Sequence, residues 1–169
     1  PDLVAALKTE IVRVYGKNPQ QSPNYARLVH RGHVSKMKEL LKGQNVLFGG
    51  NVDENDRYVA PTLIELNDLN NSLMEDEIFG PLLPILTYQD EAEIHQTITH
   101  FEKPLSFYVF SQRKKWAQNL MKKYSYGGGM INDVILYFTN DKLPFGGVGH
   151  SGMGSYHGKY SFDTFTHYK

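Results

Sequence analysis

The sequence predicts an α/β fold, in which helices cover a mainly parallel β-sheet. Residues 82–131 alternate between strand-like and helix-like segments, and such alternation is typical of parallel sheets with covering helices. The central strand-like segments are apolar on both faces, as strands buried between helices are. With 169 residues, 40% hydrophobic and 21% charged, the chain is large and apolar enough to form a buried core.

Two helices are expected first. Apolar side chains recur at helical spacing over residues 2–15 and predict an amphipathic helix that Gly16 ends. Ser22 and Pro23 form a helix start signal, an N-cap followed by proline at the first helical position. We therefore expect a second helix over residues 23–42.

Strand-like segments follow. Residues 45–48 are a short apolar run and residues 59–66 are rich in β-formers, with a polar turn at 51–57 between them. That spacing predicts a hairpin or two neighbouring strands, and the Asn- and Asp-rich stretch 67–71 is a predicted loop. The alternating region then contains expected strands at 82–88, 105–110 and 130–131, and expected helices at 90–99 and 112–124.

The end of the chain differs in composition. From Pro144 onward it is rich in glycine and aromatic residues and has few helical signals. Side chains such as Phe162 and Phe165 need burial, and an exposed aromatic band is typical of a contact surface. We expect two parts: an α/β domain over residues 1–143, and a C-terminal segment over 144–169 that contacts another domain or subunit.

Composition excludes several classes of function. The 18 Lys and Arg residues balance 18 Asp and Glu residues, so no global field attracts polyanions, and nucleic acid is not an expected partner. The chain has no cysteine, which excludes disulfides, thiolate zinc sites and a cysteine nucleophile within it. No apolar run approaches the roughly 20 residues of a membrane span. Without a signal-type start, the expected location is cytoplasmic.

Gly147-Val-Gly149-His-Ser-Gly152 matches the G-x-G-x-x-G pattern of dinucleotide-binding loops. In dinucleotide-binding proteins, such a loop is followed by a helix, a second strand and an acidic residue about 20 residues further on. Too few residues follow Gly152 for this. We expect instead a tight turn in which the backbone passes close to another segment.

His30 and His33 lie three residues apart on the second predicted helix. Two histidines at this spacing can share a helix face and bind a metal ion. No third ligand is evident, so we expect a solvated pair and no metal site.

Residues 74–81 combine acidic residues with an apolar pair and a Gly-Pro turn. The pattern fits a charged loop that leads into a strand. It also fits a carboxylate held by a rigid turn, which would accept hydrogen bonds from sugar hydroxyls beside an aromatic side chain that packs on a ring. The residues alone leave both interpretations open.

Two motifs carry a family resemblance. Glu75-Asp-Glu77-Ile-Phe-Gly-Pro81 resembles the E-E-I-F-G-P motif of the aldehyde dehydrogenase superfamily, and residues 143–154 resemble its P-F-G-G-x-x-x-S-G-x-G motif. Asn132 lies between them, as in the family, and residues 155–167 look most like class 3 enzymes. The resemblance covers essentially the whole chain, but only the C-terminal part of the family's protein.

The resemblance implies that residues 1–143 are part of a catalytic domain. The Rossmann-type domain that holds most of NAD or NADP, the catalytic cysteine and the glutamate base are expected before Pro1. No catalytic residue is therefore expected in this chain, and we expect it to be inactive alone. Two other functions stay open: an interaction module that docks on full-length relatives, and a non-catalytic ligand-binding domain.

The resemblance also implies site residues. Glu77 would accept hydrogen bonds from the nicotinamide-ribose hydroxyls, and Phe79 would pack near that ribose and ring. The expected wall of the aldehyde funnel consists of Ile135, Phe138, Thr139, Phe145 and His157. For His157 a structural role at the start of a helix stays open. The expected partners are an aldehyde substrate in the complete enzyme and further copies of the chain in a homo-oligomer.

Overall fold

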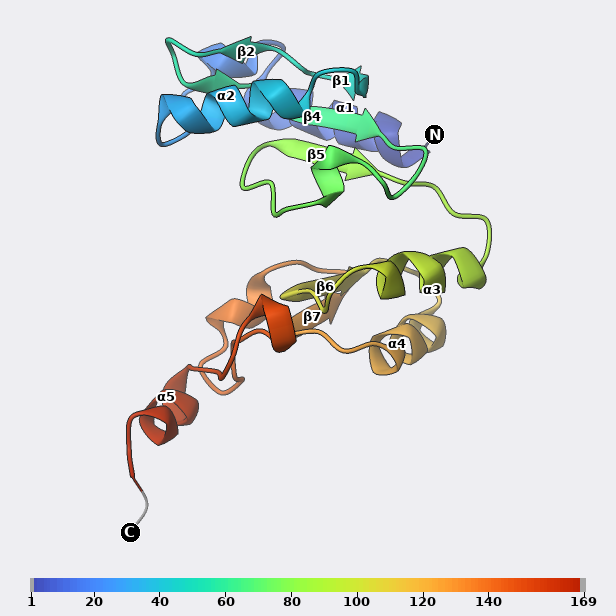
Figure 1. The fold of residues 1–169 in the computed structure, drawn as a ribbon, viewed down its shortest axis with the longest axis vertical. Helices are drawn as coiled ribbons and strands as arrows, with labels where there is room; N and C mark the ends of the chain where they lie inside the picture. Colours follow the sequence, from blue (N-terminus) through green and yellow to red (C-terminus); the bar gives the residue numbers. More distant parts are fainter. Residues whose placement is uncertain (1, 168–169) are drawn as a thin grey trace. The chain divides into compact units, whose positions relative to one another are not determined.

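The computed structural model describes residues 2–167. It divides into two compact units, unit 1 (Pro1–Gln89) and unit 2 (Asp90–Lys169). Each unit combines helices with β-strands (Figure 1), which confirms the expected α/β class. The expected segment 144–169 belongs to unit 2 as far as it is described.

Unit 1 is built on a three-stranded sheet. Its helices and strands are α1 (Asp2–Tyr15), the 3-10 helix η1 (Pro19–Gln21), α2 (Arg31–Leu40), β1 (Asn45–Phe48), β2 (Val52–Asp53), β3 (Tyr58–Val59), β4 (Thr62–Glu65), the 3-10 helix η2 (Ser72–Met74) and β5 (Leu82–Ile85). In the sheet, β4 lies between β1, antiparallel to it, and β5, parallel to it. Strands β2 and β3 form a separate antiparallel hairpin.

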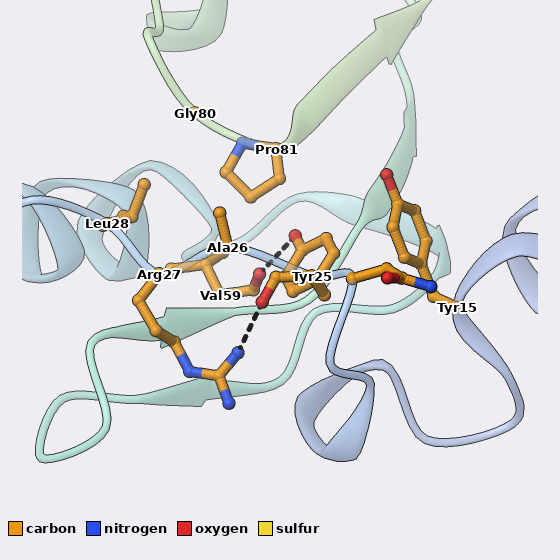
Figure 2. A pocket seen from close by; sticks show the side chains of 9 residues that line it. Tyr15, Tyr25, Ala26, Arg27, Leu28, Val59, Gly80 and Pro81 are labelled. Carbon is orange, nitrogen blue, oxygen red and sulfur yellow. Dashed lines mark hydrogen bonds between the residues drawn. The ribbon is translucent and has the colours of Figure 1, made fainter.

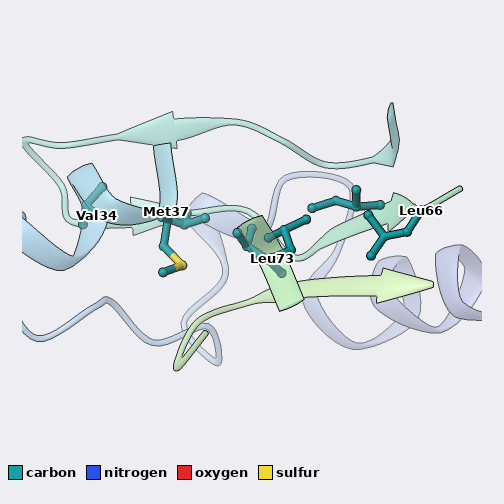
Figure 3. Close-up of a cluster of buried hydrophobic side chains, with 7 residues drawn as sticks. Val34, Met37, Leu66 and Leu73 are labelled. Carbon is teal, nitrogen blue, oxygen red and sulfur yellow. The ribbon is translucent and has the colours of Figure 1, made fainter. Parts of the chain in front are cut away.

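The core of unit 1 joins α2, η2 and the sheet (Figure 3). Seven buried hydrophobic side chains form it: Val34, Met37, Val59, Ile64, Leu66, Leu73 and Leu82. Burying one such side chain fully stabilises the fold by about 1.5–3 kcal/mol. This cluster fixes α2 against η2 and β5, the elements that precede and follow residues 75–81.

The second helix is shorter than predicted. It begins at Arg31, and His30 rather than Ser22 is its N-cap, with Nδ1 accepting from the N–H of His33 at 3.1 Å. Residues 23–30 make their hydrogen bonds elsewhere, since the Tyr25 hydroxyl donates to the Val59 carbonyl at 2.7 Å. Tertiary contacts with the β2–β3 hairpin therefore override the local start signal.

The predicted strand at 59–66 is divided. Pro61 has no N–H to donate to a sheet, and the N–H of Ala60 donates to Asn51 rather than to the ladder of β4. The predicted turn at 51–57 contains β2 and the turn of an additional hairpin, whose second strand β3 follows at residues 58–59. The pairing of β1 with β4 confirms the expected neighbouring strands.

Unit 2 contains a two-stranded parallel sheet. Its elements are α3 (Glu91–His100), β6 (Ser106–Val109), α4 (Lys114–Lys123), β7 (Gly128–Ile131), the 3-10 helices η3 (Leu136–Thr139) and η4 (Gly149–Ser151), and α5 (Gly158–Thr164). The β6–α4–β7 unit, with β6 parallel to β7, agrees with the predicted alternation. Helix α5 lies in a segment with few helical signals, since glycine and aromatic residues dominate around it, and it begins directly after His157.

Asn132 closes the end of this sheet. It follows β7 in a left-handed conformation, with φ of 59°. Its side-chain oxygen accepts from the N–H of Ser111 at 2.7 Å, and its amide donates to the Ser111 carbonyl at 3.0 Å. The side chain thus extends the pairing beyond the strand and turns the chain toward η3.

We predict that Ile64→Ala lowers the free energy of unfolding of this chain by about 2–5 kcal/mol, because it leaves a cavity in the core. Ile64 is fully buried, whereas Leu83 on the neighbouring strand is 46% exposed. Urea denaturation followed by circular dichroism measures both, with Leu83→Ala as the matched control. Equal losses from the two variants would contradict the described core.

Candidate functional site

Residues 75–81 form a loop with anchored ends. At its start the buried Leu73 fixes η2, whose N-cap Asn71 accepts from the N–H of Leu73 at 3.0 Å. At its end the Pro81 carbonyl accepts from the N–H of Thr62 at 2.8 Å, one position before the ladder of β4 and β5. Between these anchors the carboxylates of residues 75, 76 and 77 are exposed.

Glu77 and Phe79 are presented by this loop. Phe79 is 71% exposed although it is large and apolar, and its φ is 47°. A bulky residue in the left-handed region costs free energy and is retained mostly where function requires it. Glu77 accepts no hydrogen bond from the described residues 2–167, so both carboxylate oxygens are available to a ligand.

A cavity of about 330 Å³ lies beside the end of the loop (Figure 2). Gly80 and Pro81 line one side of it, and Tyr15, Tyr25 and Arg27 line the other parts. Burial raises the pKa of the Tyr25 hydroxyl, whose proton is donated to the Val59 carbonyl. The guanidinium of Arg27 is engaged by Asp56 at 2.8 Å.

The second group of expected site residues lies in unit 2, on and around η3. Ile135 is 62% exposed with φ of 63°, and it directly precedes η3. The Thr139 hydroxyl donates to the Leu136 carbonyl at 2.8 Å within η3. These two residues therefore lie at the two ends of one short segment.

An aromatic cluster contains three of the other expected residues. Phe138 and Phe145 pack edge to face, with ring centroids 5.0 Å apart. The imidazole of His157 lies 5.3 Å from the Phe138 ring and 5.9 Å from the Phe145 ring, and Tyr156 packs on it at 4.6 Å. The structure thus brings Phe138, Phe145 and His157 together.

His157 occupies the position at the start of a helix that the sequence left open. Helix α5 begins directly after it, and its N–H donates to the Ser161 hydroxyl at 2.9 Å. Its φ is 98°, and its Nδ1 is buried with no hydrogen-bond partner among the described residues. A buried polar atom normally finds a partner, so the unpartnered Nδ1 is an exception among the described residues.

The glycine-rich segment before α5 is a tight turn, as predicted. A Cβ at Gly147 would lie 2.1 Å from the Ser151 carbonyl oxygen, and Gly152 has φ of 148°. This turn returns the chain so that Phe145 and Tyr156 exchange two backbone hydrogen bonds, at 2.9 and 3.0 Å. The aromatic cluster depends on that return.

Sequence analysis missed the residues of β6 that hold η3. The Tyr108 hydroxyl accepts from the N–H of Ile135 at 3.2 Å, and the hydroxyls of Ser106 and Tyr137 are 3.0 Å apart. Positions 106 and 108 share one face of the strand. Two hydroxyl groups alternating on an otherwise apolar strand were the signal available in the sequence.

The structure describes Glu77 and Phe79 in unit 1 and the other five expected residues in unit 2. Within the range 2–167, no group of three or more His, Cys, Asp or Glu side chains is placed to hold a metal ion. None of the described helices is long and apolar enough to cross a membrane.

The chain resembles known proteins along its length. The family model described as "Aldehyde dehydrogenase family" matches residues 1–169. The chain is 49% identical over 170 residues to 4,4'-diaponeurosporen-aldehyde dehydrogenase of Staphylococcus aureus, covering 99% of this chain and 37% of that protein. It is 47% identical to aldehyde dehydrogenase family 3 member A2 of Rattus norvegicus, covering 98% of this chain and 34% of the relative. The chain therefore spans about a third of the length of these relatives.

The chain also resembles solved structures of aldehyde dehydrogenases. The substrate-bound state of Staphylococcus aureus AldH superposes with a TM-score of 0.94 at 49% identity, over 98% of this chain and 37% of that one. An aldehyde dehydrogenase of Mycobacterium tuberculosis complexed with NAD+ superposes with a TM-score of 0.83 at 20% identity, over 98% of this chain and 36% of that one. The second likeness is one of fold.

We predict that Gly128→Ala destabilises unit 2 by about 1–3 kcal/mol, as overpacking does. A Cβ at Gly128 would lie 2.4 Å from the Tyr137 ring and would displace it from Ser106. The fluorescence of the single tryptophan, Trp116, follows unfolding of this unit. Ser125→Ala, which truncates an exposed side chain of the same unit, is the control. A Gly128→Ala protein as stable as the control would refute the contact.

Proposed function

The chain belongs to the aldehyde dehydrogenase family, and from that premise we propose that it forms part of the active site of an enzyme that oxidises aldehydes to carboxylic acids with NAD or NADP. The observation that supports this most is the loop at 75–81. It exposes a carboxylate without a partner and a strained aromatic residue two positions later, between two anchored ends.

In this proposal, Glu77 and Phe79 bind the nicotinamide end of the cofactor. The two oxygens of a carboxylate can accept from the two vicinal hydroxyls of a ribose, and such charge-assisted bonds are stronger than neutral ones. Phe79 offers an exposed ring to pack on the ribose and nicotinamide. The cofactor supplies the hydride acceptor when bound. Glu77 and Phe79 hold its reactive end in a fixed position.

The aldehyde is proposed to bind along the wall formed by η3 and the aromatic cluster. Ile135, Phe138 and Phe145 offer apolar surface, and binding an apolar aldehyde there removes that surface from water. Thr139 and His157 add polar groups to the same wall. The imidazole of His157 lies among the apolar rings of that wall, with its Nδ1 buried.

The chain supplies no nucleophile in this scheme. Oxidation of an aldehyde by this family's chemistry needs a thiolate that attacks the carbonyl carbon, and the chain contains no cysteine. We therefore propose that the thiol comes from outside these residues and that the chain alone does not turn over aldehydes. We further propose a cytoplasmic location and a homo-oligomer.

We predict that Glu77→Gln in the enzyme carrying this sequence lowers the rate of hydride transfer by about one to two orders of magnitude, because a charge-assisted hydrogen bond worth roughly 1.5–3 kcal/mol is lost. Single-turnover measurements with saturating cofactor give this rate, and a titration gives the affinity for NAD. Glu75→Gln, which removes an exposed carboxylate of the same loop, is the matched control.

Affinity for NAD should change less than the rate, since Glu77 fixes only the reactive end. An unchanged single-turnover rate together with a large loss of NAD affinity would contradict the assignment. So would an equal effect of Glu75→Gln.

We predict that the chain self-associates at micromolar concentration through its C-terminal segment. Phe162 is 66% exposed and Phe165 is 88% exposed in unit 2, and exposed apolar patches favour association. Light scattering after size exclusion measures the mass, with Phe162→Ser/Phe165→Ser as the variant expected to be a monomer. A 19.3 kDa monomer across a hundredfold range of dilution would contradict the prediction.

A further inference from the structure

One face of helix α2 contacts the loop at 75–81. Met37 is fully buried, and a Cβ at Gly80 would lie 2.4 Å from its sulfur. One turn earlier on the same face, His33 lies with Nε2 3.4 Å from the Ile78 carbonyl oxygen. Residues three and four apart share a helix face, so one side of α2 contacts the loop on both sides of Phe79.

The contact of His33 bears directly on Phe79. The Ile78 carbonyl belongs to the peptide group that joins Ile78 to Phe79, and a carbonyl can only accept. Nε2 of His33 therefore carries the proton and donates it. Since Phe79 has φ of 47°, the orientation of the preceding peptide is part of its strained conformation. Holding that carbonyl opposes relaxation of Phe79 to an ordinary backbone conformation.

His33 is itself fixed by the other histidine of the pair. His30 is the N-cap of α2, and its Nδ1 accepts from the N–H of His33 at 3.1 Å. The two rings lie 5.8 Å apart. The cap fixes the start of the helix ahead of His33. His33 therefore lies within the first turn of α2, one turn before Met37 on the same face. The pair thus has a use that needs no metal ion.

We propose that His33 is a positioning residue: by donating from Nε2 to the Ile78 carbonyl, it holds Phe79 and the neighbouring Glu77 in the conformation that orients the nicotinamide end of the cofactor. This proposal rests on the proposed function of Glu77 and Phe79. Lys36, whose Nζ lies 3.8 Å from Asp76, adds an exposed ion pair that contributes little.

The test compares His33→Gln with His33→Asn. A glutamine amide nitrogen can reach the place of Nε2 and donate from there, whereas the shorter asparagine side chain cannot. The exposed His100, on α3 of unit 2, provides the control His100→Asn. Thermal unfolding of every variant shows whether unit 1 remains folded.

Two readouts follow. In the chain itself, 15N NMR is expected to show His33 with the proton on Nε2, and the amide resonance of Phe79 should move in His33→Asn but stay close to its original position in His33→Gln. In the enzyme carrying this sequence, His33→Asn should lower the single-turnover rate of hydride transfer about three- to tenfold. His33→Gln should restore it to within about twofold, with NAD affinity and KM for aldehyde nearly unchanged in both.

Several results would overturn the proposal. They are an Nε2 without a proton, equal rates for the two variants, or loss of folding in His33→Gln, which would make the contact a matter of stability alone. Glu77→Gln measured in parallel separates failure of the role of His33 from failure of the proposed function of Glu77 and Phe79. If Glu77→Gln lowers the rate and His33→Asn does not, only the role of His33 is wrong. If Glu77→Gln has no effect, the proposed function fails, while the NMR result still decides the contact between His33 and Ile78.

Discussion

The close packing of α2 against residues 75–81 is the constraint on which the rest of unit 1 depends. The sulfur of Met37 occupies the place where any side chain at position 80 would extend, and Met37 belongs to the same buried cluster as Ile64 and Leu82. Because interiors are close-packed and respond to the loss of a single methylene, the position of the loop is tied to the core. The exposed Glu77 and Phe79 thus lie on a loop that is packed against α2 and the buried core.

In unit 2, glycine residues and hydroxyl groups fix the position of η3 and the residues around it. Gly128 leaves room for the Tyr137 ring, and Gly147 leaves room for the Ser151 carbonyl. Tyr108 then holds the strained Ile135 by its backbone N–H. In both units a bulky residue with positive φ is held by groups far along the chain, as is common where strain serves a site.

The sequence allowed the regular elements to be predicted because local periodicity determines them. Helix α1 and the alternation of β5, α3, β6, α4 and β7 follow from apolar spacing. The start of α2 could not be predicted, since Tyr25 bonds to Val59 in a hairpin that lies 34 residues further along. Propensity is a weak guide where such contacts compete.

The expected site residues came from the family resemblance, whereas the residues that contact and hold them could not be predicted. Tyr108 meets Ile135 across 27 residues, and His33 meets Ile78 across 45 residues. No spacing rule relates such pairs. The sequence predicted a solvated pair of histidines, whereas the structure gives His30 a capping role and His33 a contact with the loop.

We propose that the loop of unit 1 holds the nicotinamide end of the cofactor. The most direct measurement is a crystal structure of the enzyme carrying this sequence with NAD or NADP bound. We expect a carboxylate oxygen of Glu77 at hydrogen-bond distance, about 2.5–3.0 Å, from a hydroxyl of the nicotinamide ribose, with the Phe79 ring packed against that ribose. A well-ordered cofactor whose nicotinamide ribose contacts neither residue would contradict the account.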